Sequence, residues 1–171
     1  TGIDAGYVSR VLSFLDAETL VTRVGRGRLQ TVDWPALLRR WAQDAPLDTR
    51  GRLHTFLEPR GLAALQARLA GYEGAYAITA SLAAATVAPL APPRLATVWV
   101  PDASAAGASL GLRPVDAGAN VVLAEATERT VFEGLAQRDG LWYAAPTQIV
   151  VDLLTSPGPG PQEGAELIDW M

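Results

Sequence analysis

The sequence of 171 residues predicts an α/β (α+β) fold in two parts. Beyond residue 50, patterns typical of strands and of helices alternate along the chain. A polar passage at residues 43–50 separates this region from the preceding one. Residues 1–60 hold nine arginines against seven acidic residues, whereas residues 61–171 hold five against eleven. We therefore expect a first domain over residues 1–45 and a second over residues 50–171.

The composition is that of a globular protein, with 49% hydrophobic and 19% charged residues and a net charge of −4. The chain has no cysteine, so it has no disulfide framework and no thiolate chemistry. It contains no apolar run long enough to span a bilayer, and no signal peptide. These features predict a cytoplasmic protein with no membrane partner.

The first expected element is a helix over GIDAGYVSRVLSFLDAETLV, with Asp4 as its N-cap. Its apolar residues recur at the spacing of one helical face, namely Val8, Val11, Leu12 and Leu15. The short or polar residues expected off that face are Tyr7, Ser9, Arg10 and Ser13. The helix is therefore predicted to be amphipathic, with a polar side that carries one arginine.

A two-stranded hairpin is expected next, from Leu20 to Val24 and from Arg28 to Val32. The turn between them is Gly25-Arg26-Gly27, and its glycines permit positive φ angles. Three arginines crowd into six positions of this hairpin, namely Arg23, Arg26 and Arg28. A second helix should follow, with Asp33 as its cap and Pro35 in its first turn.

A helix with an arginine on its polar face, followed at once by an arginine-rich hairpin, suits a DNA duplex. The alternative is an ordinary solvated turn whose arginines only add charge for solubility. The stretch GYVSRVLSFLDAETLVTR resembles a winged helix-turn-helix of bacterial regulators. That resemblance implies that residues 7–20 form the recognition helix and residues 21–32 the wing. It also implies DNA contacts from seven residues: Tyr7, Ser9, Arg10, Ser13, Arg23, Arg26 and Arg28. The helices that normally precede the recognition helix are not in this sequence, so we expect them in a longer protein. This chain should bind DNA only weakly, and the longer protein should bind it with an affinity well above that.

The second domain is predicted to alternate strands and helices. Extended segments are expected at residues 52–59, 75–79, 93–101 and 120–126, with a hairpin at 135–146 that turns at Asp139-Gly140. Helices are expected at residues 60–72, 80–88, 102–111, 146–154 and 161–171. The aromatic residues Trp99, Trp142 and Tyr143 fall in predicted strands, so we expect them in the core.

The segments YAITASLAAATVAPLAPPRLATVWVPD and NVVLAEATERTVFEGLAQRDGLWYAAPTQIVVDLL resemble the C-terminal domain of AbiEi-type antitoxins of type IV toxin–antitoxin systems. The resemblance covers nearly the whole chain and rests on the order of elements. It implies a winged helix joined to a domain related to the nucleotidyltransferase fold. It also implies autorepression of a toxin–antitoxin operon and a partner toxin that is itself a nucleotidyltransferase.

The sequence departs from the pattern of an active nucleotidyltransferase. Such an enzyme needs a Gly-Ser turn for phosphates and two acidic residues on the next strand for Mg²⁺. Here the turn position reads Thr79-Ala80-Ser81, and the strand at residues 94–100 has no acidic residue. Asp102 lies beyond that strand, without an acidic neighbour two residues away. We therefore expect no transferase activity.

Other catalytic chemistries also lack their residues. The chain has no lysine for a P-loop and only His54 for a zinc site or a catalytic triad. A structural or surface role for His54 is the simpler interpretation. Glu125 and Glu128 are near each other in sequence, where a solvated strand end is expected. We predict no enzyme, no cofactor and no metal.

The leading hypothesis is a bacterial DNA-binding transcriptional regulator of the antitoxin type, which acts on double-stranded DNA and pairs with a nucleotidyltransferase toxin. One alternative is a protein-interaction module that does not bind DNA. A second alternative is an enzyme with a degenerate nucleotidyltransferase fold.

Overall fold

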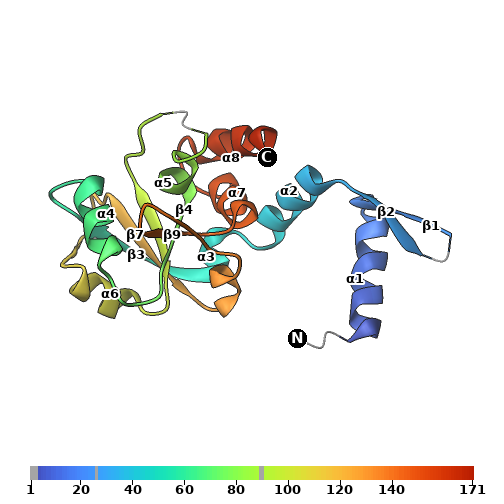
Figure 1. The fold of residues 1–171 in the computed structure, drawn as a ribbon, viewed down its shortest axis with the longest axis horizontal. Coiled ribbons are helices and arrows are strands. Elements are labelled where there is room, and N and C mark those ends of the chain that lie inside the picture. The colour runs from blue at the N-terminus through green and yellow to red at the C-terminus, as the bar shows by residue number, and fades with distance from the viewer. Residues whose placement is uncertain (1–3, 26, 89–90) are drawn as a thin grey trace. The chain divides into compact units, whose positions relative to one another are not determined.

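The computed structural model describes residues 4–25, 27–88 and 91–171 and confirms the α+β class (Figure 1). By its internal contacts the chain divides into two compact units, Thr1–Trp41 and Ala42–Met171. This division falls within helix α2 (Trp34–Asp44), just before the polar passage at residues 43–50. No helix in the described ranges has both the length and the apolar character needed to cross a membrane.

The first unit contains helix α1 (Ala5–Ala17), strands β1 (Val21–Val24) and β2 (Arg28–Val32), and the greater part of α2. These elements match the predicted order. Asp33 caps α2 as expected, because its Oδ1 accepts a hydrogen bond from the Ala36 amide at 3.0 Å. Leu20, Val21 and Leu38 are buried and form the small core of this unit.

The second unit is built on a seven-stranded mixed sheet in the order β6-β3-β7-β5-β4-β9-β8. Its strands are β3 (Gly51–Leu57), β4 (Ala77–Thr79), β5 (Ala96–Val100), β6 (Arg113–Pro114), β7 (Val121–Ala126), β8 (Ala136–Arg138) and β9 (Leu141–Tyr143). β5 pairs parallel with β7 and antiparallel with β4, so the sheet is not of the all-parallel kind. Every residue of β5 is buried, which places this strand at the centre of the core.

The helices of the second unit are α3 (Leu47–Arg50), α4 (Leu62–Ala70), α5 (Ala80–Ala84), α6 (Ala103–Ser109), α7 (Pro146–Leu154) and α8 (Gly160–Trp170). α5, α7 and α8 pack against one another (Figure 1). Local signals in the sequence explain several of their ends. The helix that contains Leu65 stops at Gly71, and Asp102 caps α6 by accepting the Ala105 amide at 2.8 Å.

Some predictions about the second unit were wrong. The polar passage contains the short helix α3, and neither β6 nor a 3₁₀ turn at Arg129–Phe132 was expected. α5 ends at Ala84, four residues before the predicted end. Trp99 and Tyr143 are buried as predicted, but Trp142 is exposed, because it alternates with the inward-facing residues Leu141 and Tyr143 on β9.

Candidate nucleic-acid interface

The polar side of α1 is accessible to solvent. The helix starts after Asp4, whose Oδ2 accepts a hydrogen bond from the Tyr7 amide at 2.9 Å, as the sequence predicts for an N-cap. Ser9, Arg10 and Ser13 are all exposed. Ser9 and Ser13 are four residues apart and therefore lie on the same side of the helix. This side presents hydroxyl and guanidinium groups of the kinds that contact bases and phosphates in a duplex.

The hairpin that follows has the predicted geometry. β1 and β2 pair antiparallel, and the hydroxyl oxygens of Thr22 and Thr31 lie 2.6 Å apart across the strands. Gly25 and Gly27 have φ angles of +59° and +88°, which glycine adopts without strain. Arg28 is exposed at the start of β2. Arg26, which the sequence predicts at the turn, lies outside the described residues.

Arg23 differs from the expectation that the hairpin arginines all extend toward phosphates. Its side chain is half-buried and bonds within its own unit. The Nε group donates to the carbonyl oxygen of Gly27 at 3.3 Å, and Nη1 donates to Ser13 Oγ at 3.4 Å. Two of the seven predicted DNA contacts, Arg23 and Ser13, are thus brought together and contact each other.

A brace between α1 and α2 was not foreseen from the sequence. The Arg40 guanidinium lies 5.4 Å from the centre of the Phe14 ring and forms an ion pair with Glu18. A cation over an aromatic ring is favourable, although the stabilisation at an exposed site is about 0.5–1 kcal/mol. No local pattern marks this contact, because Arg40 lies 22 residues from Glu18 along the chain.

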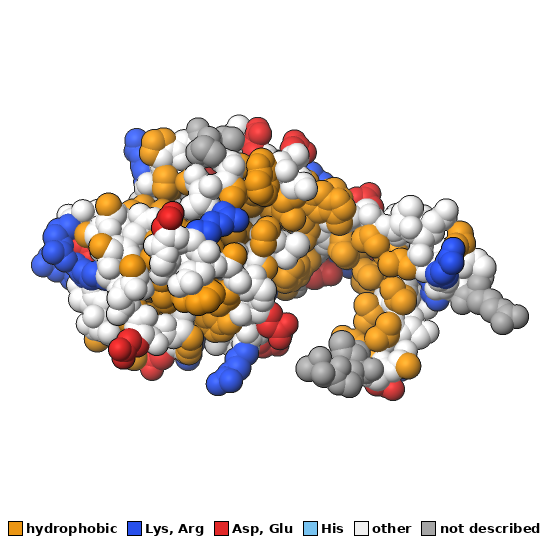
Figure 2. All heavy atoms as spheres, viewed as in Figure 1, with side chains coloured by type: hydrophobic (Ala, Val, Ile, Leu, Met, Phe, Trp, Pro, Cys, Tyr) orange, Lys and Arg blue, Asp and Glu red, His pale blue; other side chains and the backbone are white. Residues whose placement is uncertain are grey.

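The opposite side of α1 is apolar and largely uncovered. Leu12 and Leu15 are half-buried, whereas Val8, Val11 and Phe14 are exposed. Hydrophobic side chains accordingly run along α1 in Figure 2. Tyr7, with 57% of its surface exposed, precedes Phe14 by two helical turns and therefore lies on this side and not with Ser9 and Ser13.

In the second unit, the turn at Thr79-Ala80-Ser81 leads from β4 into α5, where the nucleotidyltransferase pattern would place a phosphate. Both of its hydroxyls bond to carboxylates of the same chain. Thr79 Oγ1 donates to Asp152 on α7 at 2.6 Å, and Ser81 Oγ donates to Glu163 on α8. A phosphate at these hydroxyls would meet two groups of like charge, so the turn is unsuited to bind one.

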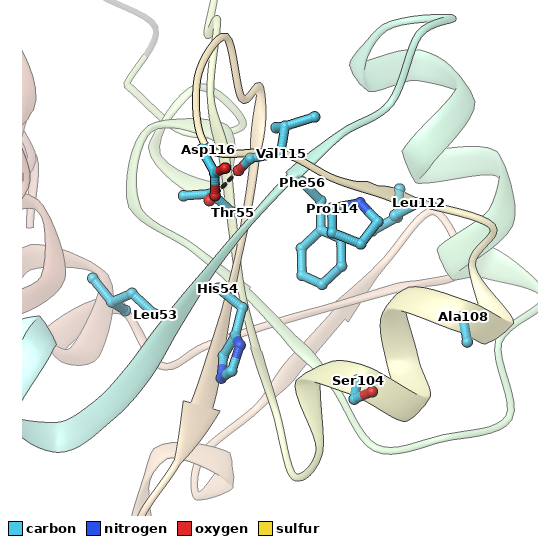
Figure 3. Close-up of a pocket in the computed structure, with 10 residues that line it drawn as sticks. All are labelled: Leu53, His54, Thr55, Phe56, Ser104, Ala108, Leu112, Pro114, Val115 and Asp116. Carbon is cyan, nitrogen blue, oxygen red and sulfur yellow. Dashed lines mark hydrogen bonds between the residues drawn. The ribbon is translucent and has the colours of Figure 1, made fainter.

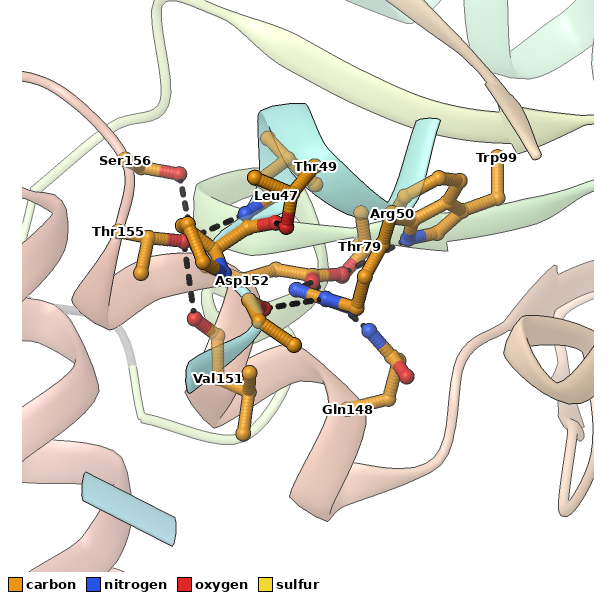
Figure 4. Close-up of polar contacts among 12 residues, drawn as sticks. Leu47, Thr49, Arg50, Thr79, Trp99, Gln148, Val151, Asp152, Thr155 and Ser156 are labelled. Atoms are coloured by element: carbon orange, nitrogen blue, oxygen red, sulfur yellow. Dashed lines mark hydrogen bonds and ion pairs between the residues drawn. The ribbon is translucent and has the colours of Figure 1, made fainter. Parts of the chain in front are cut away.

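Asp152 is the centre of a buried polar cluster (Figure 4). Besides Thr79, its carboxylate accepts hydrogen bonds from Trp99 Nε1 at 2.8 Å, Gln148 Nε2 at 2.7 Å and Arg50 Nη2 at 2.5 Å. Burial raises the pKa of Asp152, while the charge of Arg50 and the Thr79 and Trp99 donors oppose that shift. Four donors around one carboxyl group satisfy it fully, so this cluster holds strands and helix together and leaves no open ligand position.

The other acidic side chains near β5 are also engaged in structure. Asp102 caps α6, and Glu125 Oε2 accepts the Ala103 amide at 3.1 Å at the start of the same helix. That amide, and then Arg52, lower the pKa of Glu125. Within the described ranges, no three His, Asp or Glu side chains come close enough to hold a metal ion.

A groove of about 770 Å³ runs beside β3 and includes His54 (Figure 3). The residues that line it are Leu53, His54, Thr55, Phe56, Ser104, Ala108, Leu112, Pro114, Val115 and Asp116. His54 is half-buried, and its Nε2 lies 3.9 Å from Glu125 Oε2. Among the described residues, His54 Nε2 has no hydrogen-bond partner, so it does not accept a proton from Ser104 as the base of a Ser-His pair would.

The comparisons with known proteins give no relative. No family model, no curated protein sequence and no solved structure matches this chain. The winged-helix and antitoxin resemblances therefore rest on the quoted segments alone.

Proposed function

We propose that this protein is a DNA-binding transcriptional regulator of the antitoxin type, in which the first unit contacts a duplex. The observation that carries the proposal is the adjacency of an exposed polar helix side and an arginine-bearing hairpin. Ser9, Arg10 and Ser13 on α1 would meet base edges, and Arg28 on the hairpin would contact a phosphate. The second unit contributes the acidic part of the chain, with five arginines against eleven acidic residues over residues 61–171.

The antitoxin part of the proposal follows from the resemblance of the second unit to AbiEi-type proteins. In that role the protein represses its own operon and counteracts a partner nucleotidyltransferase toxin. The turn at Thr79-Ala80-Ser81 supports a non-catalytic role, because its two hydroxyls are bonded to Asp152 and Glu163. A nucleotidyltransferase toxin encoded next to this gene would support the proposed pairing of antitoxin and toxin. The promoter region of their shared operon would then supply the operator to test.

The direct test is a fluorescence-anisotropy titration of the 171-residue chain with labelled duplexes, namely that promoter region and a random sequence. We expect binding that weakens as salt rises from about 50 to 200 mM, because phosphate contacts release counterions. The matched control is the Arg10→Ala/Arg28→Ala double variant, which keeps the fold because both side chains are exposed. Equal binding by wild type and the double variant, or no binding by either, would contradict the proposal.

A second candidate function is a protein-interaction module. It is favoured by one observation, the apolar side of α1 on which Tyr7, Val11 and Phe14 are exposed. Phe14→Ser and Val11→Ser would then abolish binding to a partner protein, and that binding would change little with salt. DNA binding that survives both substitutions would favour the regulator.

A further inference from the structure

Arg23 is set apart from the other arginines of the proposed interface by its contacts. Arg10 and Arg28 are exposed, whereas Arg23 is half-buried and donates to both Gly27 and Ser13. One guanidinium therefore contacts the turn of the hairpin and the polar side of α1 together. Arginine suits such a contact, because its rigid fork of donors bonds two acceptors in a fixed geometry.

The backbone around Arg23 favours this inward position. The register of the hairpin shifts between Thr22 and Arg23, and such an irregularity re-aims the side chain next to it. Gly27 lies against the guanidinium, since a Cβ at that position would be 2.5 Å from Arg23 Nη2. Glycine at position 27 thus provides the positive φ and also the space that the guanidinium fills.

We propose that Arg23 is a positioning residue, which fixes the hairpin on α1 and so places Arg28 against the duplex, without contacting a phosphate itself. This inference rests on the proposed DNA-binding function for its consequence, but the contact itself exists in the protein without DNA. Groups that act together on a ligand must be held by neighbouring side chains in one geometry, and Arg23 does this for the helix and the hairpin.

The variant that separates positioning from charge is Arg23→Lys. Lysine keeps the positive charge but presents a single ammonium group in place of the fork. A phosphate contact would be largely retained by lysine, whereas a bridge between two acceptors would be lost. We therefore expect Arg23→Lys and Arg23→Ala to reduce DNA affinity equally, within about twofold. Wild-type affinity in Arg23→Lys would overturn the inference.

A double-mutant cycle tests whether Arg23 acts through Arg28. If Arg23 only places Arg28, then Arg23→Ala should have less than half of its effect on log affinity once Arg28 is already alanine. Two independent phosphate contacts would give additive losses and would overturn the inference. Ser13→Ala is the matched change at the other end of the bridge, and its effect on hydrogen exchange in the free protein should be non-additive with that of Arg23→Ala.

A measurement without DNA keeps the inference separate from the proposed function. Amide hydrogen exchange of the free protein should be roughly three- to tenfold faster in β1 and β2 of Arg23→Lys than in wild type, as expected for losing one or two hydrogen bonds. Arg28→Lys is the control and should leave exchange unchanged.

If exchange in Arg23→Lys matches wild type, the positioning role is wrong, whatever the DNA result. If exchange changes but the wild-type chain binds no duplex, Arg23 fixes the hairpin but does not place Arg28 for DNA, which contradicts that part of the inference and the DNA-binding function.

Discussion

The two units of this protein use polar side chains in opposite ways. In the first unit, Ser9, Arg10 and Arg28 are exposed, and α1 has no buried residue among those described. In the second unit, the carboxylates of Asp152 and Glu58 are fully buried and contact Arg50 and Arg68, respectively. Exposed donor groups are open to a partner, whereas buried carboxylates that are paired with arginines contribute to the fold. The contrast is in keeping with the proposed function, in which the first unit recognises a duplex, and it makes the polar groups at the centre of the second unit structural.

The largest effect is expected from breaking the polar cluster of the second unit. Asp152→Asn replaces an acceptor of four hydrogen bonds with a side chain that also carries donors, and it removes the charge that faces Arg50. Loss of one member of a buried ion pair typically costs about 3–5 kcal/mol. We expect the free energy of unfolding to fall by that amount in urea melts followed by circular dichroism. Asp169→Asn, at an exposed position on α8, is the matched control, and a loss below about 1 kcal/mol for Asp152→Asn would contradict a structural role for the cluster.

This cluster also shows where the sequence does not suffice. Arg50 and Asp152 are 102 residues apart, and no local pattern connects them. Helix α3 was missed for the same reason. The amide of its first residue, Leu47, donates at 3.2 Å to Thr155 Oγ1, which lies 108 residues further along the chain. By contrast, elements with local signals were predicted correctly, such as the hairpin turn at Asp139-Gly140, where both residues have positive φ. The inward position of Arg23 likewise depends on a tertiary contact that residue type alone does not reveal.

The next prediction sharpens the recognition role of the first unit. Arg10 lies on the side of α1 proposed to enter the major groove, and Arg28 lies on the hairpin. Arg10→Ala should remove about 1–3 kcal/mol of discrimination between the specific and the random duplex, as is typical for a base contact. Arg28→Ala should weaken both duplexes alike and lower the log–log salt slope by about one unit. Identical salt slopes and specificity ratios for wild type and both variants would contradict this division of roles.

A smaller effect is expected from the brace inside the first unit. Arg40→Ala removes the guanidinium that covers Phe14 and faces Glu18. Because both partners are partly exposed, the loss should be about 0.5–1.5 kcal/mol, from one cation–π contact and one surface ion pair. Thermal melts should show it, and Arg39→Ala at an exposed neighbouring position should not. If Arg40→Ala left the melting temperature unchanged, the contacts of Arg40 with Phe14 and Glu18 would not stabilise the protein.

The smallest effect concerns Glu125, which joins β7 to the start of α6 close to solvent. The Ala103 amide and then Arg52 lower the pKa of Glu125 below its ordinary value. A carboxyl group whose pKa is lowered in the folded state contributes stability above its unfolded pKa, and that contribution disappears as the pH falls through the folded pKa. Wild type should therefore lose this stability as the pH falls below about 4.5, near the ordinary glutamate pKa.

The variant Glu125→Gln cannot ionise, so its unfolding free energy should be lower than that of wild type at pH 7 and closer to it in acid. Glu128→Gln, an exposed neighbour, is the control and should change neither value. A constant difference between wild type and Glu125→Gln from pH 7 to pH 3 would mean that the two hydrogen bonds do not depend on the charge of this carboxylate.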